Sequence, residues 1–236
     1  MNLILLEDVD FTSDSHVRLD GRRARHIFGV HRAKLDDVLR VGLINGLIGE
    51  GRCLRIDEGS CELEVHFSAS PPSPLPLTLY LALPRPKFLK RILQTVSSLG
   101  VKDIHLLNSY RVEKVYWSCA QLEAHAIREA LLLGLEQSRD TIVPRVHQHR
   151  LFKPFVEDEL PALVKDTRAL VAHPLATAAC PRESSTSHTS LAVGPEGGFI
   201  DYEIEKFANA GFTPVEIGAR ILKVETAVTA LIAKLT

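Results

Sequence analysis

The sequence predicts an α/β protein in which a small β-rich N-terminal domain precedes a larger domain built on a mostly parallel sheet. Beyond residue 76, short apolar runs alternate with longer segments whose apolar residues recur at helical spacing, which is typical of the βα units of a parallel sheet. Before residue 71, short apolar or alternating runs are separated by Asp, Gly and Asn turns, which is typical of a small barrel or sandwich.

A proline-rich stretch separates these two patterns. Residues 68–76 read SASPPSPLP, and proline both fixes φ and removes a backbone donor, so no regular element is expected to run through them. We therefore predict an N-terminal domain at 1–70, a linker at 71–76 and a C-terminal domain at 77–236.

The N-terminal domain is predicted to consist of strands with one helical segment. That segment is RRARHIFGVHRAK, residues 22–34, which we interpret as a short helix and a following loop. The predicted strands are NLILL, HVRL, VLRVGL, RCLRI and CELEVHF.

The C-terminal domain begins with a clear strand and helix. LTLYLAL at 77–83 predicts a buried strand, and PKFLKRILQTVSSLG at 86–100 predicts a helix that ends in a cap at Gly100. VKDIHLL at 101–107 predicts the next strand, and AQLEAHAIREALLLGLEQ at 120–137 predicts a long helix.

The remaining chain continues this alternation. RALVA and LAVG predict short buried strands, and TPVEI predicts another strand after them. DYEIEKFANAG predicts a helix with Asp201 as its N-cap and Gly211 as its stop. The last helix has one apolar stripe, which specifies its interior face. This stripe consists of Val224, Ala227, Val228, Leu231, Ile232 and Leu235.

Composition limits the classes of protein to be considered. The 236 residues are 45% hydrophobic, enough for ordinary globular cores. The formal net charge of −1 argues against a globally basic protein, although a local basic surface for RNA remains compatible with it. The N-terminus MNLILLEDVD lacks the features of a signal peptide, and no apolar run approaches the roughly 20 residues of a membrane span, so we expect a cytoplasmic protein.

Neither cysteine nor histidine spacing predicts a metal site. The four cysteines have no CxxC spacing, so we expect them to be reduced and structural; they are Cys53, Cys61, Cys119 and Cys180. His147 and His149 could share one face of a strand, but no HExxH motif or carboxylate cluster accompanies them, and we predict no metal.

Three loops should meet at the carboxyl ends of the predicted parallel strands, where ligands bind in such sheets. They are AHPLAT at 172–177, GPEGG at 194–198 and IGARILKVETA at 217–227. Two interpretations of GPEGG remain open: an ordinary turn, or a turn whose glycines let the backbone approach a ligand. The sequence has neither a GxGxxG nor a GxxxxGK[ST] motif, which disfavours a Rossmann dehydrogenase or a P-loop enzyme.

These loops resemble the RsmE family of the SPOUT, or α/β-knot, methyltransferases. The family's late signature, roughly LGxRILRxETA after a GPEGG turn, is matched by Ile217, Gly218, Arg220, Ile221, Leu222, Lys223, Glu225, Thr226 and Ala227. HPLAT, EQS at 136–138, LGV at 99–101 and RHIFGVHR at 25–32 are similar to further landmarks of the family. The resemblance covers nearly the whole chain.

The chain departs from the family pattern at a few positions. Lys223 replaces the usual arginine, Thr95 and Ser98 stand where the family often has Lys and Glu, and EQS is not followed by Gly-Arg. Because arginine and lysine differ in donor geometry, the resemblance specifies the cofactor more closely than the RNA target.

The resemblance implies a C-terminal SPOUT trefoil-knot methyltransferase domain and a PUA-like, RNA-binding β-barrel at the N-terminus. It implies methylation of N3 of a uridine in 16S ribosomal RNA, with S-adenosylmethionine as cofactor. It places the cofactor on the three loops, where main-chain groups hold the adenine. The implied cofactor residues are His173, Pro174, Gly194, Glu196, Gly197, Gly198, Ile217, Gly218, Ile221, Leu222, Thr226 and Ala227.

Three residues are candidates for the chemistry. Arg220 offers several directed donors for an anionic uracil oxygen or a phosphate. Glu196 and Glu225 are candidate bases for the N3 proton, although Glu196 could instead fix its loop and Glu225 could favour the helix dipole or tie down the knot. Thr226 could cap a helix as readily as touch a ligand.

RNA binding requires cations placed along phosphates. Candidate cations occur in both domains and could form one track, or they could be ordinary solvated surface; with a PUA-like module implied, we favour the track. They are Arg22, Arg23, Arg25, His26, Arg32 and Lys34, with Arg85, Lys87, Lys90 and Arg91 on the first C-terminal helix.

We expect small-subunit ribosomal RNA as the partner, in an assembled 30S subunit, and a homodimer without membrane contact. Two alternatives remain open. One is a SPOUT enzyme that acts on another rRNA or tRNA base, and the other is a noncatalytic RNA-binding protein that retains the knot fold.

Overall fold

The computed structural model describes residues 2–182 and 187–236. Its residues form two compact units. The N-terminal unit comprises Met1–Ser73 together with Leu132–Val143, and the C-terminal unit comprises Pro74–Leu131 together with Pro144–Thr236.

The N-terminal unit contains a six-stranded sheet in the order β1-β4-β5-β6-β3-β2, in which β1 and β4 are parallel and the other neighbours are antiparallel. Among the described residues its edges are β1 and β2, and its likeness to a PUA-like barrel stays a prediction. Its elements are β1 (Ile4–Leu6), η1 (Asp8–Asp10), β2 (Phe11–Ser13), β3 (His16–Asp20), α1 (Gly21–His26), η2 (Ile27–His31), β4 (Val38–Leu43), β5 (Ile48–Ile56) and β6 (Ser60–Ala69).

The first strand explains why residues 132–143 belong to the N-terminal unit. Side chains alternate across a strand, and here Ile4 and Leu6 enter the core under the sheet, while Leu3 and Leu5 pack against Leu135 on the other side. The backbone N–H groups of Asn2 and Leu3 both donate to the Glu136 carbonyl, at 2.9 and 3.0 Å. The four residues from Leu3 to Leu6 are all apolar because both faces of the strand are covered.

The C-terminal unit contains a second six-stranded sheet, in which all neighbours are parallel in the order β12-β10-β11-β7-β8-β9. Its elements are β7 (Leu77–Ala82), α2 (Pro86–Ser98), β8 (Asp103–Leu107), η3 (Lys114–Ser118), η4 (Ala120–Leu122), β9 (Arg145–His149), α4 (Phe152–Pro154), η5 (Phe155–Glu159), α5 (Leu160–Leu163), β10 (Arg168–Ala172), β11 (Thr189–Val193), α6 (Asp201–Asn209), β12 (Thr213–Val215) and α7 (Val224–Leu235). The helix α3 (Ala124–Ser138) begins in this unit, and from Leu132 onward it belongs to the N-terminal unit.

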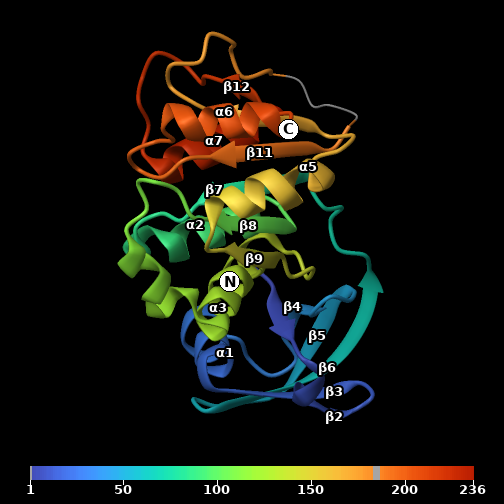
Figure 1. The fold of residues 1–236 in the computed structure, drawn as a ribbon. Helices are drawn as coiled ribbons and strands as arrows, with labels where there is room; N and C mark the ends of the chain where they lie inside the picture. Colours follow the sequence, from blue (N-terminus) through green and yellow to red (C-terminus); the bar gives the residue numbers. More distant parts are fainter. Residues whose placement is uncertain (1, 183–186) are drawn as a thin grey trace. The chain divides into compact units, whose positions relative to one another are not determined.

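The strand order contains a switch point between β7 and β11. From β7 the chain proceeds through β8 to β9, and it then returns to the other half of the sheet through β10, β11 and β12. Helices pack on the sheet, with α2 against α7 and α6 against η5 (Figure 1). Ligands in sheets of this type bind outside the carboxyl ends of the strands near such a switch.

The α/β prediction with a parallel sheet is confirmed, and most predicted elements are present. Gly100 follows the end of α2 with a φ of +88°, as a C-terminal glycine should. The N-cap at Asp201 is wrong by one position, because Asp201 is already helical and Ile200 is the cap. The cysteines are free, as predicted. In the described parts of the chain, no helix is both long and apolar enough to cross a membrane.

Candidate functional site

The ends of three parallel strands surround a pocket of about 250 Å³ in the C-terminal unit. The chain leaves β10 at Ala172, β11 at Val193 and β12 at Val215, and the segments that follow these strands line the pocket. The helix α7 closes it with Ala227 and Leu231. All the residues predicted for the cofactor line this pocket except Thr226.

The turn after β11 approaches its own chain too closely for side chains. A Cβ at Gly194 would lie 3.0 Å from the Phe199 nitrogen and 3.2 Å from Gly198, and these are backbone atoms that a substitution could not push aside easily. Gly198 has a φ of +72°, which residues with a side chain rarely adopt. The glycines therefore place backbone groups, rather than side chains, at the wall of the pocket.

Two polar contacts fix this turn to other segments of the C-terminal unit. The Glu196 carboxylate accepts the backbone N–H of Arg85 at 3.0 Å, at the start of α2. The Arg111 guanidinium donates to the Gly197 carbonyl. Of the two interpretations that the sequence left open for Glu196, the geometry supports the loop-fixing one, although Glu196 also lines the pocket.

Glu203 joins the same turn to the loop that follows β8. Its side chain is buried, with 2% exposure of the residue, and it accepts backbone N–H groups from Tyr110 at 2.7 Å and from Ile200 at 3.0 Å. A buried carboxylate needs such donors. Because Tyr110 precedes Arg111, Glu203 also fixes the backbone from which Arg111 reaches the turn.

The loop after β12 supplies the remaining wall and the cationic candidate. Gly218 has a φ of +142°, and Arg220 and Ile221 line the pocket while remaining exposed. Glu225 and Thr226 lie in the first turn of α7 and do not line the pocket. A carboxylate there favours the helix dipole, which supports the structural interpretation of Glu225.

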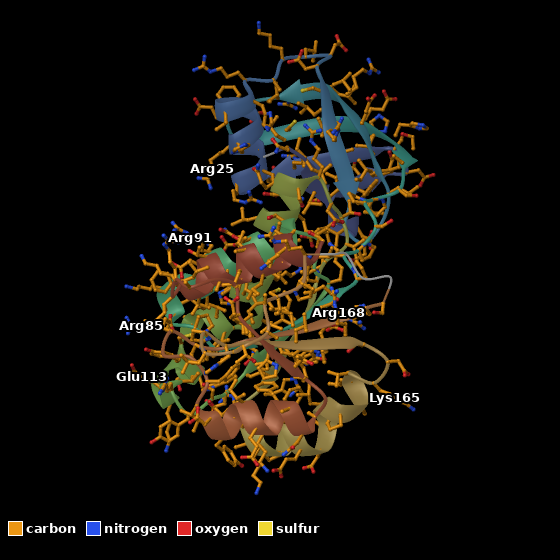
Figure 2. All side chains as sticks on the ribbon, turned by 90° about the horizontal axis from the view of Figure 1, so that it is seen from above. Arg25, Arg85, Arg91, Glu113, Lys165 and Arg168 are labelled. Atoms are coloured by element: carbon orange, nitrogen blue, oxygen red, sulfur yellow. The ribbon has the colours of Figure 1, made fainter. Side chains whose placement is uncertain are left out.

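The cations predicted on α2 differ in their partners. Lys90 lies 3.0 Å from Glu129, and the Lys87 ammonium lies 4.8 Å from the centre of the Phe88 ring. Figure 2 shows Arg85 and Arg91 on one side of the C-terminal unit, with Lys165 on the opposite side of that view. Arg85 and Arg91 are exposed and well placed to meet a polyanion.

In the N-terminal unit, two of the predicted RNA-binding cations make ion pairs within the protein. Arg23 forms a two-pronged pair with the buried Asp10, with both N···O distances at 2.6 Å, and Arg22 pairs similarly with the buried Glu136 at 2.6 and 3.0 Å. These pairs fix α1 to its own unit.

The other four candidates lie on or just after the same helical segment. Arg25, Arg32 and Lys34 are exposed, whereas His26 is half-buried and its ring packs edge-on against His31. Burial, followed by nearby positive charge, lowers the pKa of His26. Arg25, Arg32 and Lys34 are therefore better placed for phosphates than Arg22 and Arg23.

Sequence reasoning did not find Arg111 or Glu203. Glu203 stands three residues after the helix cap, the spacing of a capping-box glutamate, so its contact with the Ile200 N–H could have been anticipated. Arg111 belongs to no local motif, because its partner Gly197 is 86 positions away in the sequence.

A family model described as an RNA methyltransferase domain matches residues 71–236. The ribosomal RNA small subunit methyltransferase E of Treponema pallidum is 28% identical over 240 residues, which cover 98% of this chain and 88% of that protein. The protein of the same name from Synechocystis is 30% identical over 181 residues, which cover 75% of this chain and 58% of that protein.

Solved structures share the fold. A protein from Legionella pneumophila, whose structure holds bound SAM, superposes with a TM-score of 0.79 at 21% identity and covers 99% of this chain and 96% of its own. A ribosomal RNA small subunit methyltransferase E from Neisseria gonorrhoeae, bound to S-adenosyl methionine, gives a TM-score of 0.74 at 22% identity and covers 99% of this chain and 95% of its own.

Glu203→Gln tests the two hydrogen bonds by which the buried Glu203 carboxylate joins the Tyr110 backbone to the cap of α6. The amide keeps one acceptor oxygen and turns an NH₂ group toward a backbone donor, so we expect a loss of about 1.5–3 kcal/mol in the free energy of unfolding. Urea unfolding measures this loss, and hydrogen exchange at the Tyr110 and Ile200 amides should accelerate. The matched control is Glu205→Gln on the exposed side of α6. Equal losses in the two variants would contradict a stabilising role for the hydrogen bonds that Glu203 accepts from Tyr110 and Ile200.

Proposed function

Because the chain belongs to the RNA methyltransferase domain family, and within it to the ribosomal RNA small subunit methyltransferase E group, we propose that it transfers a methyl group from S-adenosylmethionine to ribosomal RNA. The observation that supports this most strongly is the pocket itself. It lies where three strands end, and its walls combine backbone, small residues and apolar side chains with four polar ones, His173, Glu196, Glu216 and Arg220.

The residues of the pocket suit S-adenosylmethionine. Such a ligand combines a flat adenine, which needs apolar contacts and main-chain hydrogen bonds, with a polar tail. Val193, Val224, Ala227 and Leu231 supply apolar surface, and the three glycines of the turn at 194–198 bring backbone without a Cβ to the pocket. The turns at 172–174 and 215–218 complete the binding site.

The bound cofactor supplies an electrophilic methyl group on a positively charged sulfur. The protein must then hold the target nitrogen in line with it and help to remove the nitrogen's proton. Arg220 is exposed at the pocket and is assigned to stabilise an anionic uracil oxygen or to hold a neighbouring phosphate. Glu196 lines the pocket whereas Glu225 does not, so Glu196 is the better placed proton acceptor.

The specific target in this proposal is N3 of a uridine in 16S ribosomal RNA, and the substrate is the assembled small subunit. That atom lies on the pairing edge of the base, so the uridine must be unpaired or flipped out before it can react. A trefoil knot in the C-terminal unit and a PUA-like N-terminal unit belong to the same proposal. A ribosomal substrate would place the protein in the cytoplasm.

The proposal includes a homodimer. Leu175 is 83% exposed and Ile221 is 86% exposed, and Leu222 beside it is also exposed. Exposed apolar side chains on pocket loops are costly unless a partner covers them, and a second copy of the chain would do so with two-fold symmetry.

Ala227→Leu tests the cofactor pocket. Ala227 lines the pocket from α7, so a larger side chain should fill part of it and weaken S-adenosylmethionine binding at least tenfold. Ala233→Leu is the matched control, because it adds the same side chain at an exposed position of the same helix. Calorimetric titration of both variants measures the change. Wild-type affinity in a folded Ala227→Leu protein would place the cofactor elsewhere.

Arg25→Glu tests the RNA surface of the N-terminal unit. Arg25 is exposed, and its Nε donates only weakly to Gly21 of its own helix, at 3.3 Å. We expect severalfold weaker binding to small ribosomal subunits and a plot of log affinity against log salt that is shallower by about one unit. Lys165→Glu, an equal charge change at an exposed position of the C-terminal unit, should have little effect (Figure 2).

Small ribosomal subunits also serve to test methyl transfer itself. Subunits that lack the modification are incubated with protein and cofactor, and mass mapping of the RNA locates any new methyl group. Methylation at uridine N3 supports the full proposal. A methyl group on another base would overturn the uridine assignment, and tight RNA binding without cofactor binding or methyl transfer would indicate a noncatalytic RNA-binding protein.

A further inference from the structure

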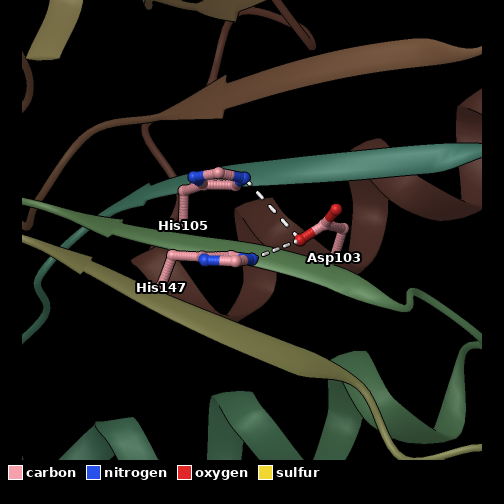
Figure 3. Close-up of side chains that lie close together, drawn as sticks. All are labelled: Asp103, His105 and His147. Atoms are coloured by element: carbon pink, nitrogen blue, oxygen red, sulfur yellow. Dashed lines mark hydrogen bonds and ion pairs between the residues drawn. The ribbon is translucent and has the colours of Figure 1, made fainter. Parts of the chain in front are cut away.

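Two imidazoles and a carboxylate converge at one edge of the C-terminal sheet (Figure 3). Asp103 and His105 lie on β8, and His147 lies on β9, where it is the registered partner of His105. Side chains two apart on a strand share a face, and registered partners do so as well. The three side chains therefore meet because of the strand pairing.

This cluster is separate from the proposed cofactor pocket. Asp103 is the first residue of its strand, whereas the pocket is formed by the segments that follow the last residues of β10, β11 and β12. None of its three residues lines the pocket. Methyl transfer therefore gives no account of them.

The distances suit ligation of a metal ion. His147 Nε2 lies 3.0 Å from Asp103 Oδ1, His105 Nε2 lies 3.7 Å from the same oxygen, and all three atoms lie within 4.8 Å of one another. A tetrahedral zinc ion with bonds of 2.0–2.1 Å needs ligand atoms about 3.3 Å apart. The His147 side chain is 43% exposed, but its ring stacks on that of His105 with the centroids 4.5 Å apart. Ligation therefore requires His147 to turn away from this stack and to move by at most about 1.5 Å.

A second layer of contacts orients the buried imidazole. His105 Nδ1 and His149 Nε2 are 2.9 Å apart, and the His105 ring stacks on Tyr80 with the centroids 4.7 Å apart. A proton on His105 Nδ1, donated to His149, leaves a lone pair on Nε2 that faces the Asp103 carboxylate. Histidine ligands of metals are commonly oriented by such a bond from the other ring nitrogen.

The charges around the cluster are compatible with a cation. His105 is buried, with Nδ1 facing His149 and Nε2 facing the Asp103 carboxylate. Arg145 lies 3.4 Å from Asp103, but from Oδ2 rather than from the oxygen that faces the imidazoles. Asp103 and His147 are partly exposed, which gives an ion a path from solvent.

We propose that Asp103, His105 and His147 bind one divalent transition-metal ion of the zinc type. The ligands are one carboxylate oxygen and two Nε2 atoms, and water takes the fourth position. The ion joins the edge strand β9 to β8. This proposal differs from the expectation from the sequence, which was that the chain holds no metal. That expectation considered His147 together with His149, and it did not consider Asp103 on the neighbouring strand.

The test uses the full chain and zinc alone. Competition with a chromophoric chelator measures affinity and stoichiometry, and cobalt substitution gives a visible absorption band for a four-coordinate site. We expect one ion per chain, with binding at least tenfold weaker in His147→Ala and in Asp103→Asn. The control is His125→Ala, because His125 is an exposed histidine that also faces a carboxylate, Glu123, at 3.3 Å.

Thermal melting of the same proteins separates binding from misfolding. Zinc should raise the melting temperature of the wild type and of His125→Ala, and it should not raise that of His147→Gln, whose side chain can still hydrogen-bond to Asp103. No stoichiometric zinc binding by the wild type, or equal affinity in the His147 and Asp103 variants, would show that the three side chains form only an ion pair. Neither outcome bears on methyl transfer.

Discussion

The pocket depends on a turn that folds back on itself so tightly that position 194 has no room for a side chain. The backbone nitrogen of Phe199 would lie 3.0 Å from a Cβ there, and the turn then reverses through Gly198 at a φ of +72°. This close approach exposes backbone groups at the carboxyl end of β11, beside the switch point of the sheet. The remaining contacts of the site serve to keep that turn in place.

These contacts come from widely separated parts of the sequence. Glu196 fixes the turn to the start of α2, Arg111 donates to the Gly197 carbonyl, and Glu203 binds both the Tyr110 backbone and the cap of α6. The turn is thus held from two neighbouring elements and from the helix that follows it. A site preorganised in this way can bind a ligand through main-chain groups with little further ordering.

The sequence predicted the parts of this structure that local pattern controls. Strands such as 77–83 and helices such as 86–100 follow from apolar spacing, and the three pocket loops follow from strand ends in a parallel sheet. It raised a strand only as a possibility at His147 and His149 and did not place β9, whose RVHQH sequence is polar because it lies at an edge. It also did not predict the packing of Leu135 against β1. Nor could it show that Arg23 is held by Asp10, because that pairing depends on how α1 packs.

We propose that the three loops after β10, β11 and β12 form the cofactor site. Hydrogen exchange followed by mass spectrometry, with and without S-adenosylmethionine, tests this claim across the whole chain in one measurement. If the three loops hold the cofactor, exchange should slow in peptides covering 172–177, 193–198 and 215–227, with little change in residues 2–69. Saturating cofactor that protects other segments and leaves these three loops unchanged would contradict it.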